Sequence, residues 1–347
     1  MLVDAFDYSL PKELIAQTPA LERDESRLMV VHRLSGQIEH RFFYDLPEYL
    51  NPGDLLVLNN TRVRSARLFG HKETGGAVEV LLLKPSRGED DPDRRNWEAL
   101  LHSRKKLRPG SRISVDDRLT AEVLGQKEDG IWEIRLEADG CIENLIEKLG
   151  YPPLPPYIKR EKASPSSQDR SRYQTVFAAR TGSAAAPTAG LHFTDKLLAT
   201  VTSKGIGVLT VTLHVGLGTF QPVRVKSLED HHMHREHYEV ESDTARILLD
   251  AQRSKRRVIA CGTTSVRVIE TISNQPDSLT GDTDLFIYPG YHFGLVQGMI
   301  TNFHLPRSTL LMLVAAFAGQ DLIFRAYREA IDRRYRFYSY GDAMLIL

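Results

Sequence analysis

Asp54-Leu55-Leu56-Val57-Leu58-Asn59 is a short apolar run that follows Pro52-Gly53 and precedes Asn60. Such a run between turn signals predicts a fully buried strand. The pattern changes directly afterwards, because residues 62–138 contain a series of short β-like runs separated by turns such as Pro109-Gly110 and Asp129-Gly130. These runs lie at 78–84, 97–101, 111–115, 119–124 and 131–136, the last two forming a predicted hairpin. Many short strands with turn signals predict a small antiparallel barrel.

The sequence beyond this module alternates between helical and strand patterns. Helices are predicted at 142–149, 195–204, 243–254, from Ser265 onward and over 308–336 with a break at Gly319, and strands at 208–215, 258–261 and 285–288. The Ser-rich, charged stretch 162–172 predicts no regular structure. The predicted fold class is therefore a mixed α/β (α+β) main domain, residues 1–64 and 152–347, interrupted by an inserted small antiparallel β-barrel domain, residues 65–151.

The composition of the 347 residues favours a globular cytoplasmic protein. Hydrophobic residues make up 41% and charged residues 26%, which is enough apolar side chain for a buried core. Lys plus Arg (45) balances Asp plus Glu (45), so any contact with nucleic acid must come from local basic patches. The two cysteines fit no CxxC or zinc spacing, which favours a reducing compartment. The first residues lack a signal-peptide pattern and the longest apolar run, 310–318, is too short for a bilayer, so we expect no membrane association.

His214 closes the predicted strand 208–215, and a loop containing Gly216, Gly218 and Thr219 follows it. Ligands of α/β sheets bind beyond the carboxyl ends of the strands, and glycines let the backbone approach a ligand closely. This position predicts a functional histidine. The alternative is a surface histidine on the polar face of a strand.

Cys261-Gly262-Thr263-Thr264-Ser265-Val266-Arg267 predicts a strand, a tight turn and a helix start. The free N–H groups of a helix N-terminus, the hydroxyls of Thr263, Thr264 and Ser265 and the guanidinium of Arg267 would suit an anion or a carboxylate. The alternative is an ordinary helix cap.

Two further segments are candidates for ligand contact. The small-residue loop 180–194 contains Thr188, Gly190 and His192, and it is either a shaped, ligand-facing loop or a flexible linker. The segment 301–306 contains Asn302 and His304, which either hydrogen-bond a purine or cap a buried turn.

The histidine-rich segment 230–237 resembles a metal site only superficially. Consecutive histidines cannot all point one way, and the segment has neither an HExxH order nor a cysteine. We therefore predict no metal and favour polar contacts with the substrate or a solvated loop. No GxGxxG pattern follows a predicted strand, so a Rossmann dinucleotide site or an ordinary methyltransferase fold is unsupported.

Three basic clusters lie at 104–108, 253–257 and 333–336. Such clusters are usually solvated, but in a chain without net charge at least one is expected to contact phosphates. We assign that role to Arg253, Lys255, Arg256 and Arg257.

Several long motifs, in the same order along the chain, resemble the S-adenosylmethionine:tRNA ribosyltransferase-isomerases of the queuosine biosynthesis family. The matching segments are 6–8 with 11–17, 53–63, 154–158, 173–175, 185–194, 213–220, 262–267, 301–313 and 338–346. The resemblance is weakest at 65–150 and at 162–172.

This resemblance implies a reaction, its substrates and a fold. S-adenosylmethionine, as co-substrate, would react with tRNA carrying 7-aminomethyl-7-deazaguanine at the wobble position and give epoxyqueuosine-tRNA, adenine and methionine. It implies an α/β domain interrupted by a β-barrel, with no metal or prosthetic group. We expect a monomer whose basic cluster at 253–257 contacts the tRNA.

The chemistry assigns hypothetical roles to the candidate residues. His214 would be the general base, with His192 as the alternative, and His304 with Asn302 would contact or protonate adenine. Thr263, Thr264, Ser265 and Arg267 would take the methionyl carboxylate or a phosphate, and Thr188, Gly190, Gly216, Gly218 and Thr219 would line the substrate site. Two rival functions are a tRNA methyltransferase that uses the same co-substrate and a non-catalytic tRNA-binding protein.

Overall fold

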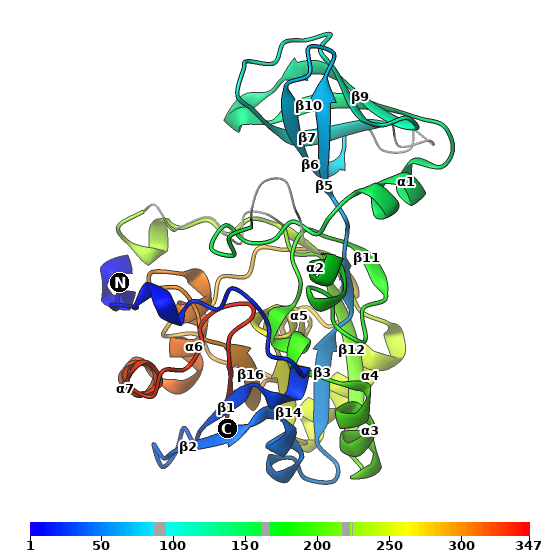
Figure 1. Cartoon of the computed structure of the whole chain (residues 1–347). Coiled ribbons are helices and arrows are strands. Elements are labelled where there is room, and N and C mark those ends of the chain that lie inside the picture. The colour runs from blue at the N-terminus through cyan, green and yellow to red at the C-terminus, as the bar shows by residue number, and fades with distance from the viewer. Residues whose placement is uncertain (87–94, 161–166, 217–222, 224) are drawn as a thin grey trace. The chain divides into compact units, whose positions relative to one another are not determined.

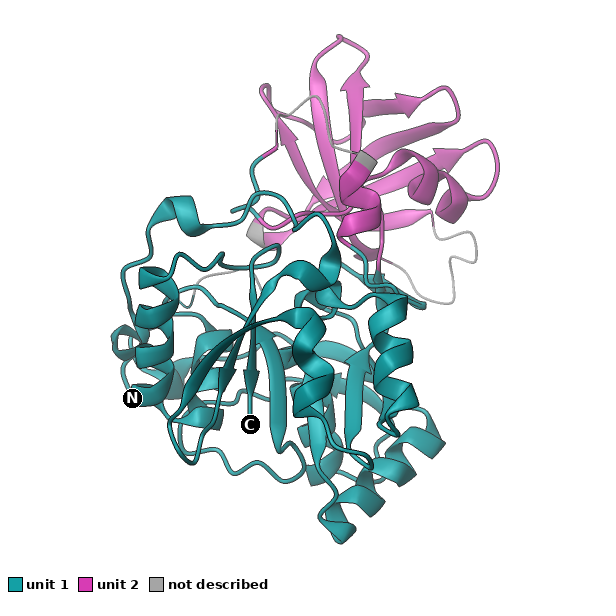
Figure 2. Ribbon diagram, turned by 60° about the horizontal axis from the view of Figure 1, so that its bottom comes forward, with its two compact units in different colours: residues 1–62, 156–159, 174–347 teal, residues 63–155, 160–173 magenta. Residues whose placement is uncertain are grey.

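The computed structural model describes residues 1–347 apart from 87–94, 161–166, 217–222 and 224. The chain forms two compact units (Figure 2). The main unit contains residues 1–62, 156–159 and 174–347, and the barrel unit contains residues 63–155 and 160–173. The sequence predicts an inserted domain at 65–151; the observed barrel unit extends slightly beyond both boundaries and also takes in residues 160–173.

The main unit is built on a nine-stranded sheet in the order β15-β13-β12-β3-β14-β16-β17-β1-β2. Figure 1 labels β12, β3, β14, β16, β1 and β2 of this sheet. Its strands are β1 (Arg27–Val31), β2 (Ile38–Phe42), β3 (Leu55–Asn59), β12 (Gly207–Leu213), β13 (Glu236–Glu239), β14 (Val258–Cys261), β15 (Thr280–Thr283), β16 (Gly298–Asn302) and β17 (Ala343–Ile346). The central strands β12, β3, β14 and β16 are parallel, so their carboxyl ends meet at one edge of the sheet. The predicted strand at 54–59 is confirmed as β3, which is buried along its whole length.

Both faces of this sheet are covered, which explains why its central strands are apolar throughout. Alternate residues of β3 enter different cores: Leu55 and Val57 pack on one face, and Leu56 and Leu58 on the other. The first face is covered by α4 (Ser242–Ser254), α5 (Thr263–Asn274), α6 (Thr309–Ala318) and α7 (Gln320–Asp332). The second is covered by α3 (Asp195–Ser203) and the 3-10 helix η4 (Phe43–Tyr49). The result is a sheet between two helical layers.

The helices of the main unit begin and end close to their predicted positions because the sequence marks their termini. The Thr194 side chain accepts from the Leu197 N–H and caps α3, and the Ser308 side chain caps α6 in the same way. Gly319, with φ +88°, separates α6 from α7 at the predicted break. Within the part of the chain that the structure describes, no single helix is long and apolar enough to cross a membrane; α6 and α7 pass that test only as a pair bent by 115°.

The barrel unit is a closed six-stranded antiparallel barrel in the order β10-β7-β6-β5-β8-β9. Its strands are β5 (Arg67–Lys72), β6 (Ala77–Pro85), β7 (Asn96–Ser103), β8 (Arg112–Asp116), β9 (Leu119–Gln126) and β10 (Trp132–Ala138), followed by α1 (Ile142–Leu149) and α2 (Ser167–Arg172). Alternate residues such as Val78, Val80 and Leu82 fill its interior. The predicted fold class, an α/β domain with an antiparallel barrel, is confirmed, and so is the hairpin of β9 and β10.

One predicted strand is not formed, and several observed elements are not predicted by the sequence. Residues 285–288 form no strand; their side chains pack on the main core from an extended segment outside the sheet, and the Leu285 carbonyl accepts from Arg267. The described part of the stretch 162–172 contains α2, where no regular structure is predicted. The strands β1, β2, β5, β13, β15, β16 and β17 are not predicted by the sequence. β4 (Thr61–Val63), which follows β3, and β11 (Arg180–Ser183), which precedes η6 (Thr188–His192), form a separate two-stranded sheet.

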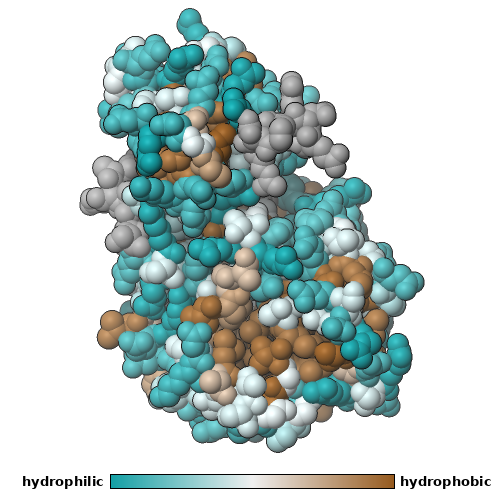
Figure 3. All heavy atoms as spheres, turned by 90° about the vertical axis from the view of Figure 1, so that its right-hand side faces the viewer, coloured by the Kyte–Doolittle hydropathy of each residue, from teal (hydrophilic) through white to brown (hydrophobic). Residues whose placement is uncertain are grey.

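One face of the molecule shows apolar side chains gathered over the main unit (Figure 3). The surface of the barrel unit visible in the same view is mainly hydrophilic. Exposed polar strand residues around a filled interior are the usual arrangement of a small barrel.

Candidate active site

The carboxyl ends of the four parallel strands bring together residues from distant parts of the sequence. His214 follows β12, Thr61 follows β3, Gly262 and Thr263 follow β14, and Asn302 ends β16. Neighbouring strands lie roughly 4.8 Å apart, so these residues form a row along one edge of the sheet. The edge is the usual position for ligand binding in an α/β sheet.

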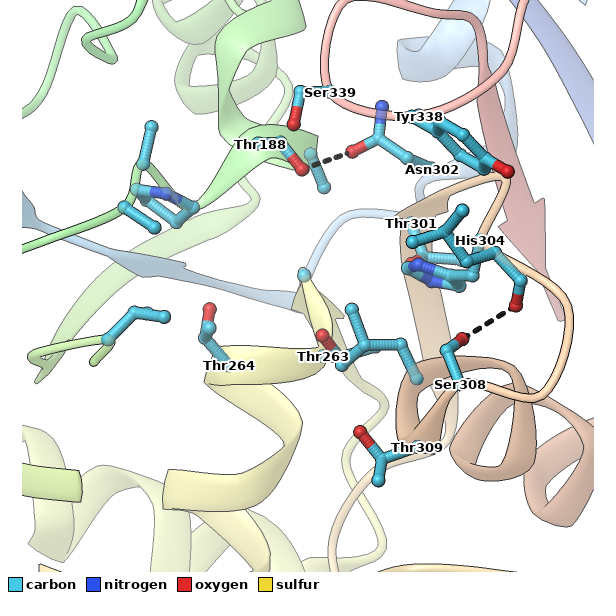
Figure 4. A pocket seen from close by; sticks show the side chains of 18 of the residues that line it. Thr188, Thr263, Thr264, Thr301, Asn302, His304, Ser308, Thr309, Tyr338 and Ser339 are labelled. Atoms are coloured by element: carbon cyan, nitrogen blue, oxygen red, sulfur yellow. Dashed lines mark hydrogen bonds between the residues drawn. The ribbon is translucent and has the colours of Figure 1, made fainter. Parts of the chain in front are cut away.

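A pocket of the main unit opens at this edge (Figure 4). Its polar lining comes from η6, from the start of α5, from the end of β16 and the start of α6, and from the segment before β17. The polar residues are Tyr157, Thr188, Glu236, Thr263, Thr264, Arg267, Thr301, Asn302, His304, Ser308, Thr309, Tyr338 and Ser339. Ala185, Ala186, Pro187, Ala189, Val215 and Leu310 contribute much of its apolar wall.

The pocket contains some of the predicted site residues and leaves others out. Thr188, Thr263, Thr264, Arg267, Asn302 and His304 line it. Among the described residues, His192, His214, Gly190, Gly216 and Ser265 are not part of its lining. Gly218 and Thr219 lie outside the described residues.

Asn302 forms one corner of the pocket together with Thr188. The Thr188 hydroxyl donates to Asn302 Oδ1 at 2.8 Å (Figure 4). The amide nitrogen of Asn302 lies 3.1 Å from His192 Nε2, and His192 Nδ1 lies 2.6 Å from the Ser26 hydroxyl. His192 therefore lies behind Asn302, and both of its ring nitrogens are engaged.

Both buried histidines near the pocket are held neutral. Burial, together with the positive charges of Arg336 and Arg23, lowers the pKa of His192 to about 3. Burial alone lowers the pKa of His304 to about 3. His304 Nε2 lies 2.7 Å from the Thr301 hydroxyl. At neutral pH neither residue is an imidazolium that could donate a proton to a leaving group, which argues against the acid role suggested for His304.

The N-terminus of α5 presents open donor and acceptor groups to the pocket. Gly262, the residue before the helix, has φ +87°, a conformation that a side chain would strain. No side chain caps the helix at this residue. The Thr264 hydroxyl oxygen is buried and has no hydrogen-bond partner among the described residues. Ser265 instead donates to the carbonyl of Cys261, the last residue of β14, at 2.7 Å, so its hydroxyl is used structurally.

Arg267 lines the pocket but its guanidinium is already engaged. It forms an ion pair with Glu236, and it donates to the carbonyls of Leu285 and Thr283, each at 3.1 Å. Glu236 also accepts from the Gly216 N–H at 2.9 Å. The buried pair thus ties α5 to β13 and to the start of the loop after β12, where the sequence predicts substrate contact for Arg267 and Gly216.

His214 is held beside the pocket by neighbours from three segments. Its Nδ1 lies 2.8 Å from the Thr61 hydroxyl, and its ring stacks at 6.4 Å on the ring of His237. A Cβ added at Gly182 would approach the His214 ring to 2.8 Å. Gly182 therefore has to be a glycine if the ring keeps this position. Gly190 is similarly constrained, because a Cβ there would lie 2.7 Å from Phe177.

Tyr338 is a pocket residue that the sequence does not predict. Its φ of +71° is rare for a residue with a bulky side chain, and such strain is concentrated at functional sites. Its ring lies 4.8 Å from that of Tyr157, whose hydroxyl lies 2.7 Å from the Ser339 hydroxyl. The conformation of Tyr338 leaves no sequence signal, although the tail 338–346 is one of the motifs that carry the family resemblance.

The basic cluster predicted to contact tRNA lies at the opposite edge of the sheet, before the amino end of β14. Arg257 forms an ion pair with the buried Asp54 and donates to the Tyr49 carbonyl at 2.9 Å. Arg256 donates to the Gly53 carbonyl, and Arg253 lies 3.4 Å from Asp250. Lys255 ends α4 with φ 55°. Most of the charge in this cluster is therefore used within the fold.

Among the described residues, no group of three or more His, Cys, Asp or Glu side chains is placed to hold a metal ion. His231, His232, His234 and His237 thus form no metal cluster.

The fold and the pocket define an α/β protein with a pocket at the carboxyl edge of its sheet and an inserted barrel. A family model described as "Queuosine biosynthesis protein" matches residues 3–346. The chain belongs to this family, so the resemblance predicted from the sequence is confirmed, and it is an enzyme of the ribosyltransferase-isomerase type.

Individual relatives match this chain over their whole length. The chain is 54% identical to the S-adenosylmethionine:tRNA ribosyltransferase-isomerase of Symbiobacterium thermophilum and 50% identical to that of Thermotoga maritima, covering 100% of both chains in each case. It is also similar to the crystal structure of the S-adenosylmethionine tRNA ribosyltransferase from Thermotoga maritima. That match has a TM-score of 0.56 and 40% identity, and it covers 99% of this chain and 100% of that one.

Proposed function

We propose that the chain transfers the ribosyl group of S-adenosylmethionine to 7-aminomethyl-7-deazaguanine at the wobble position of tRNA and isomerises it. The products are epoxyqueuosine-tRNA, adenine and methionine. The full-length match to named ribosyltransferase-isomerases is the observation that carries this proposal. S-adenosylmethionine acts as a co-substrate, and the chemistry requires no prosthetic group. We also propose that the enzyme is a monomer and that it acts in the cytoplasm on its tRNA substrate.

The pocket supports binding of a nucleoside with an attached amino acid. Its largely apolar wall, with Tyr157 and Tyr338, suits a purine, and the corner of Asn302 and Thr188 offers hydrogen-bond acceptors. The open N–H groups of α5 and the partnerless Thr264 hydroxyl suit the methionyl carboxylate. Thr263 lies at the same helix start. Arg267 and Ser265 would support this site through their bonds within the fold.

The reaction needs a base beside C5′ of the ribosyl group. The sulfonium acidifies the two C5′ hydrogens, and one of them must be lost because each carbon of the product ring carries only one. The precursor amine forms a C–N bond to the ribosyl carbons and loses a proton, and ring closure bonds C5′ to the former anomeric carbon. The methionyl thioether leaves with the C–S electron pair when the epoxide oxygen bonds to C5′. The glycosidic bond also breaks, and adenine leaves carrying a proton.

His214 is the best candidate for this base. Its ring is fixed by Thr61 and by the close approach of Gly182. The strands β12 and β14 flank β3 and so lie about 10 Å apart, a separation that an extended S-adenosylmethionine can span. His192 is the weaker alternative, because it is buried and both of its nitrogens are engaged.

Two basic clusters are candidates for tRNA contact. The assignment to Arg253, Lys255, Arg256 and Arg257 remains a prediction, but the engagement of Arg256 and Arg257 within the fold weakens it. Arg104, Lys105, Lys106 and Arg108 of the barrel unit are exposed, and no ion pair holds them among the described residues. Exposed cations of this kind release counterions when they bind phosphate, so the second cluster is the stronger candidate.

Product analysis tests the proposed reaction. The chain is incubated with S-adenosylmethionine and tRNA carrying the precursor base, and the products are identified by mass spectrometry. We expect one adenine and one methionine for each modified tRNA. S-adenosylhomocysteine without adenine would identify a methyltransferase, and tRNA binding without turnover would identify a binding protein.

A further inference from the structure

The chain of hydrogen bonds behind the pocket has a defined direction. The Ser26 hydroxyl lies 3.3 Å from the Arg23 carbonyl, which can only accept, so Ser26 donates to it. Ser26 has one hydrogen and must then accept from His192 Nδ1–H. In a neutral imidazole the other nitrogen, Nε2, is left as an acceptor. His192 is buried and therefore neutral, with the ring of Phe43 stacked on it at 5.0 Å.

This tautomer fixes the orientation of the Asn302 amide. The Nε2 acceptor of His192 receives a hydrogen from Asn302 Nδ2 at 3.1 Å. The same nitrogen lies 3.5 Å from the Asp342 carbonyl oxygen. If the amide were flipped, Asn302 Oδ1 would take this position and face another oxygen. Both amide hydrogens thus point away from the pocket, and Oδ1 points toward Thr188 (Figure 4).

The corner of the pocket is left with two acceptors and no donor. Thr188 gives its one hydroxyl hydrogen to Asn302 Oδ1, so its own oxygen keeps free lone pairs. Oδ1 has a second lone pair as well. A group with two N–H donors fits this corner, whereas a carbonyl oxygen would face two other oxygens.

We propose that His192 is a positioning residue that, through Asn302, makes this pocket select a 6-aminopurine over a 6-oxopurine. The inference rests on the proposed function, because the 6-aminopurine is the adenine of S-adenosylmethionine. His192 does not contact the ligand; it keeps the Asn302 carbonyl turned toward the exocyclic amine. The specificity therefore depends on a residue outside the pocket lining.

The test compares two co-substrates that differ only at this position. S-adenosylmethionine and its deaminated 6-oxo analogue, S-inosylmethionine, are assayed with saturating precursor tRNA, and the ratio of their kcat/KM values is measured. When a substrate leaves buried acceptors of the site unpaired, its kcat/KM is typically lower by roughly 10- to 100-fold. We expect a ratio in that range for the unmodified chain. Any intrinsic difference between the leaving groups is common to all variants and cancels when their ratios are compared.

Two substitutions of His192 form a matched pair. In His192→Gln the side-chain amide reaches the position of Nε2 and can still accept from Asn302. In His192→Asn it reaches only the position of Nδ1, so it can still bond to Ser26 but no longer to Asn302. We expect His192→Gln to keep the ratio within about threefold and His192→Asn to abolish most of the discrimination. A general structural role would lower activity toward both co-substrates without changing their ratio.

Three outcomes would overturn the inference: a ratio near one in the unmodified chain, equal ratios in the two variants, or the opposite tautomer. The tautomer is read from one- and two-bond ¹⁵N–¹H correlations of the His192 ring, which must show Nδ1 protonated at neutral pH. This measurement decides the question even if a variant does not fold. An unmodified chain that releases no adenine from S-adenosylmethionine would instead refute the proposed function.

Discussion

The two edges of the main sheet use polar residues in different ways. At the carboxyl edge, Asn302, Thr188 and Thr264 keep lone pairs open toward a pocket, and buried neighbours orient the Asn302 amide. At the amino edge, Asp54 and Arg257 satisfy each other and join the start of β3 to the start of β14. The first arrangement leaves hydrogen-bonding capacity for a ligand, and the second uses it to hold the fold.

The comparison shows that the number of charges in a segment does not indicate its function. The cluster at 253–257 is strongly basic, yet much of its charge is engaged with Asp54, Asp250 and backbone carbonyls. His192 and Asn302 carry no charge, yet they define the chemistry of the pocket corner. The experiments below can separate the two edges.

The largest effect is expected from His214 at the carboxyl edge. His214→Ala should lower turnover by roughly 10²–10⁴-fold, the usual contribution of a positioned base, with a smaller effect on co-substrate binding. With S-adenosylmethionine dideuterated at C5′, the unmodified enzyme should give a product with at most one deuterium. A product that retains both deuterons, or a variant with normal turnover, would remove His214 from the role of base. His232→Ala, at an exposed histidine, is the matched control.

The buried histidines should make the carboxyl edge sensitive to acid. The pKa of His192 is about 3 in the folded chain against 6.5 as its ordinary value, so the unfolded chain binds one more proton between these values. The associated stability is complete above pH 6.5 and is lost as the pH falls toward 3, by up to about 1.4 kcal/mol per pH unit. The free energy of unfolding is measured with denaturant at pH 7.5 and at pH 5. Between these two pH values it should fall by about 2 kcal/mol less in His192→Gln than in the unmodified chain.

An equal fall in the free energy of unfolding of both proteins would mean that His192 becomes protonated while the chain stays folded. His232→Gln again serves as the control, because it makes the same replacement at an exposed side chain.

At the amino edge, Asp54→Ala should reduce stability. The carboxylate is buried, pairs with Arg257 and accepts from the Asn51 N–H at 2.7 Å. Its removal should lower the free energy of unfolding by about 2 to 3 kcal/mol, less than for a fully buried pair because Arg257 is partly exposed. At a temperature where the variant is folded, kcat should stay within about twofold. A large fall in kcat would show that the two edges are coupled.

The smallest effect is expected for the basic clusters and is measured as a salt dependence. Replacing Arg104, Lys105 and Lys106 by Gln should weaken tRNA binding and flatten the plot of log Kd against log salt by up to about one unit for each phosphate that is no longer bound. The matched triple replacement of Arg253, Lys255 and Arg256 should change the slope less. A larger change of slope in the second triple variant would identify the 253–257 cluster as the tRNA contact.

Much of the fold could be predicted because it depends on local patterns. The apolar run at 54–59, the repeated short strands and the capping residues before α3 and α6 are visible in a few neighbouring residues. The strand β17 escapes prediction because it is short and fits the sheet only through β1 and β16, partners far away in the sequence. The apolar residues 285–288 look like a strand but obtain their burial by packing on the core.

The candidate site could be predicted as a set of segments but not as an arrangement. The sequence indicates His192, Asn302, Thr188 and Ser265, yet nothing in it says that His192 lies behind Asn302 or that Ser265 donates to the carbonyl at the end of β14. Those relations join residues such as 192 and 302 and depend on the register of whole strands. The strained Tyr338 and the engagement of Arg257 are likewise properties of the folded chain.

The order of strands in the main sheet has a consequence for how the chain folds. β1 lies beside β17, and Arg27 at its start donates to Asp342, 315 residues further along the sequence. The barrel, in contrast, pairs strands that are mostly close neighbours along the chain. Closing a long loop costs entropy before its contacts form, so contacts between distant residues form slowly. We therefore expect a refolding intermediate in which amide hydrogens of the barrel are already protected from exchange while those of β1 and β17 still exchange freely.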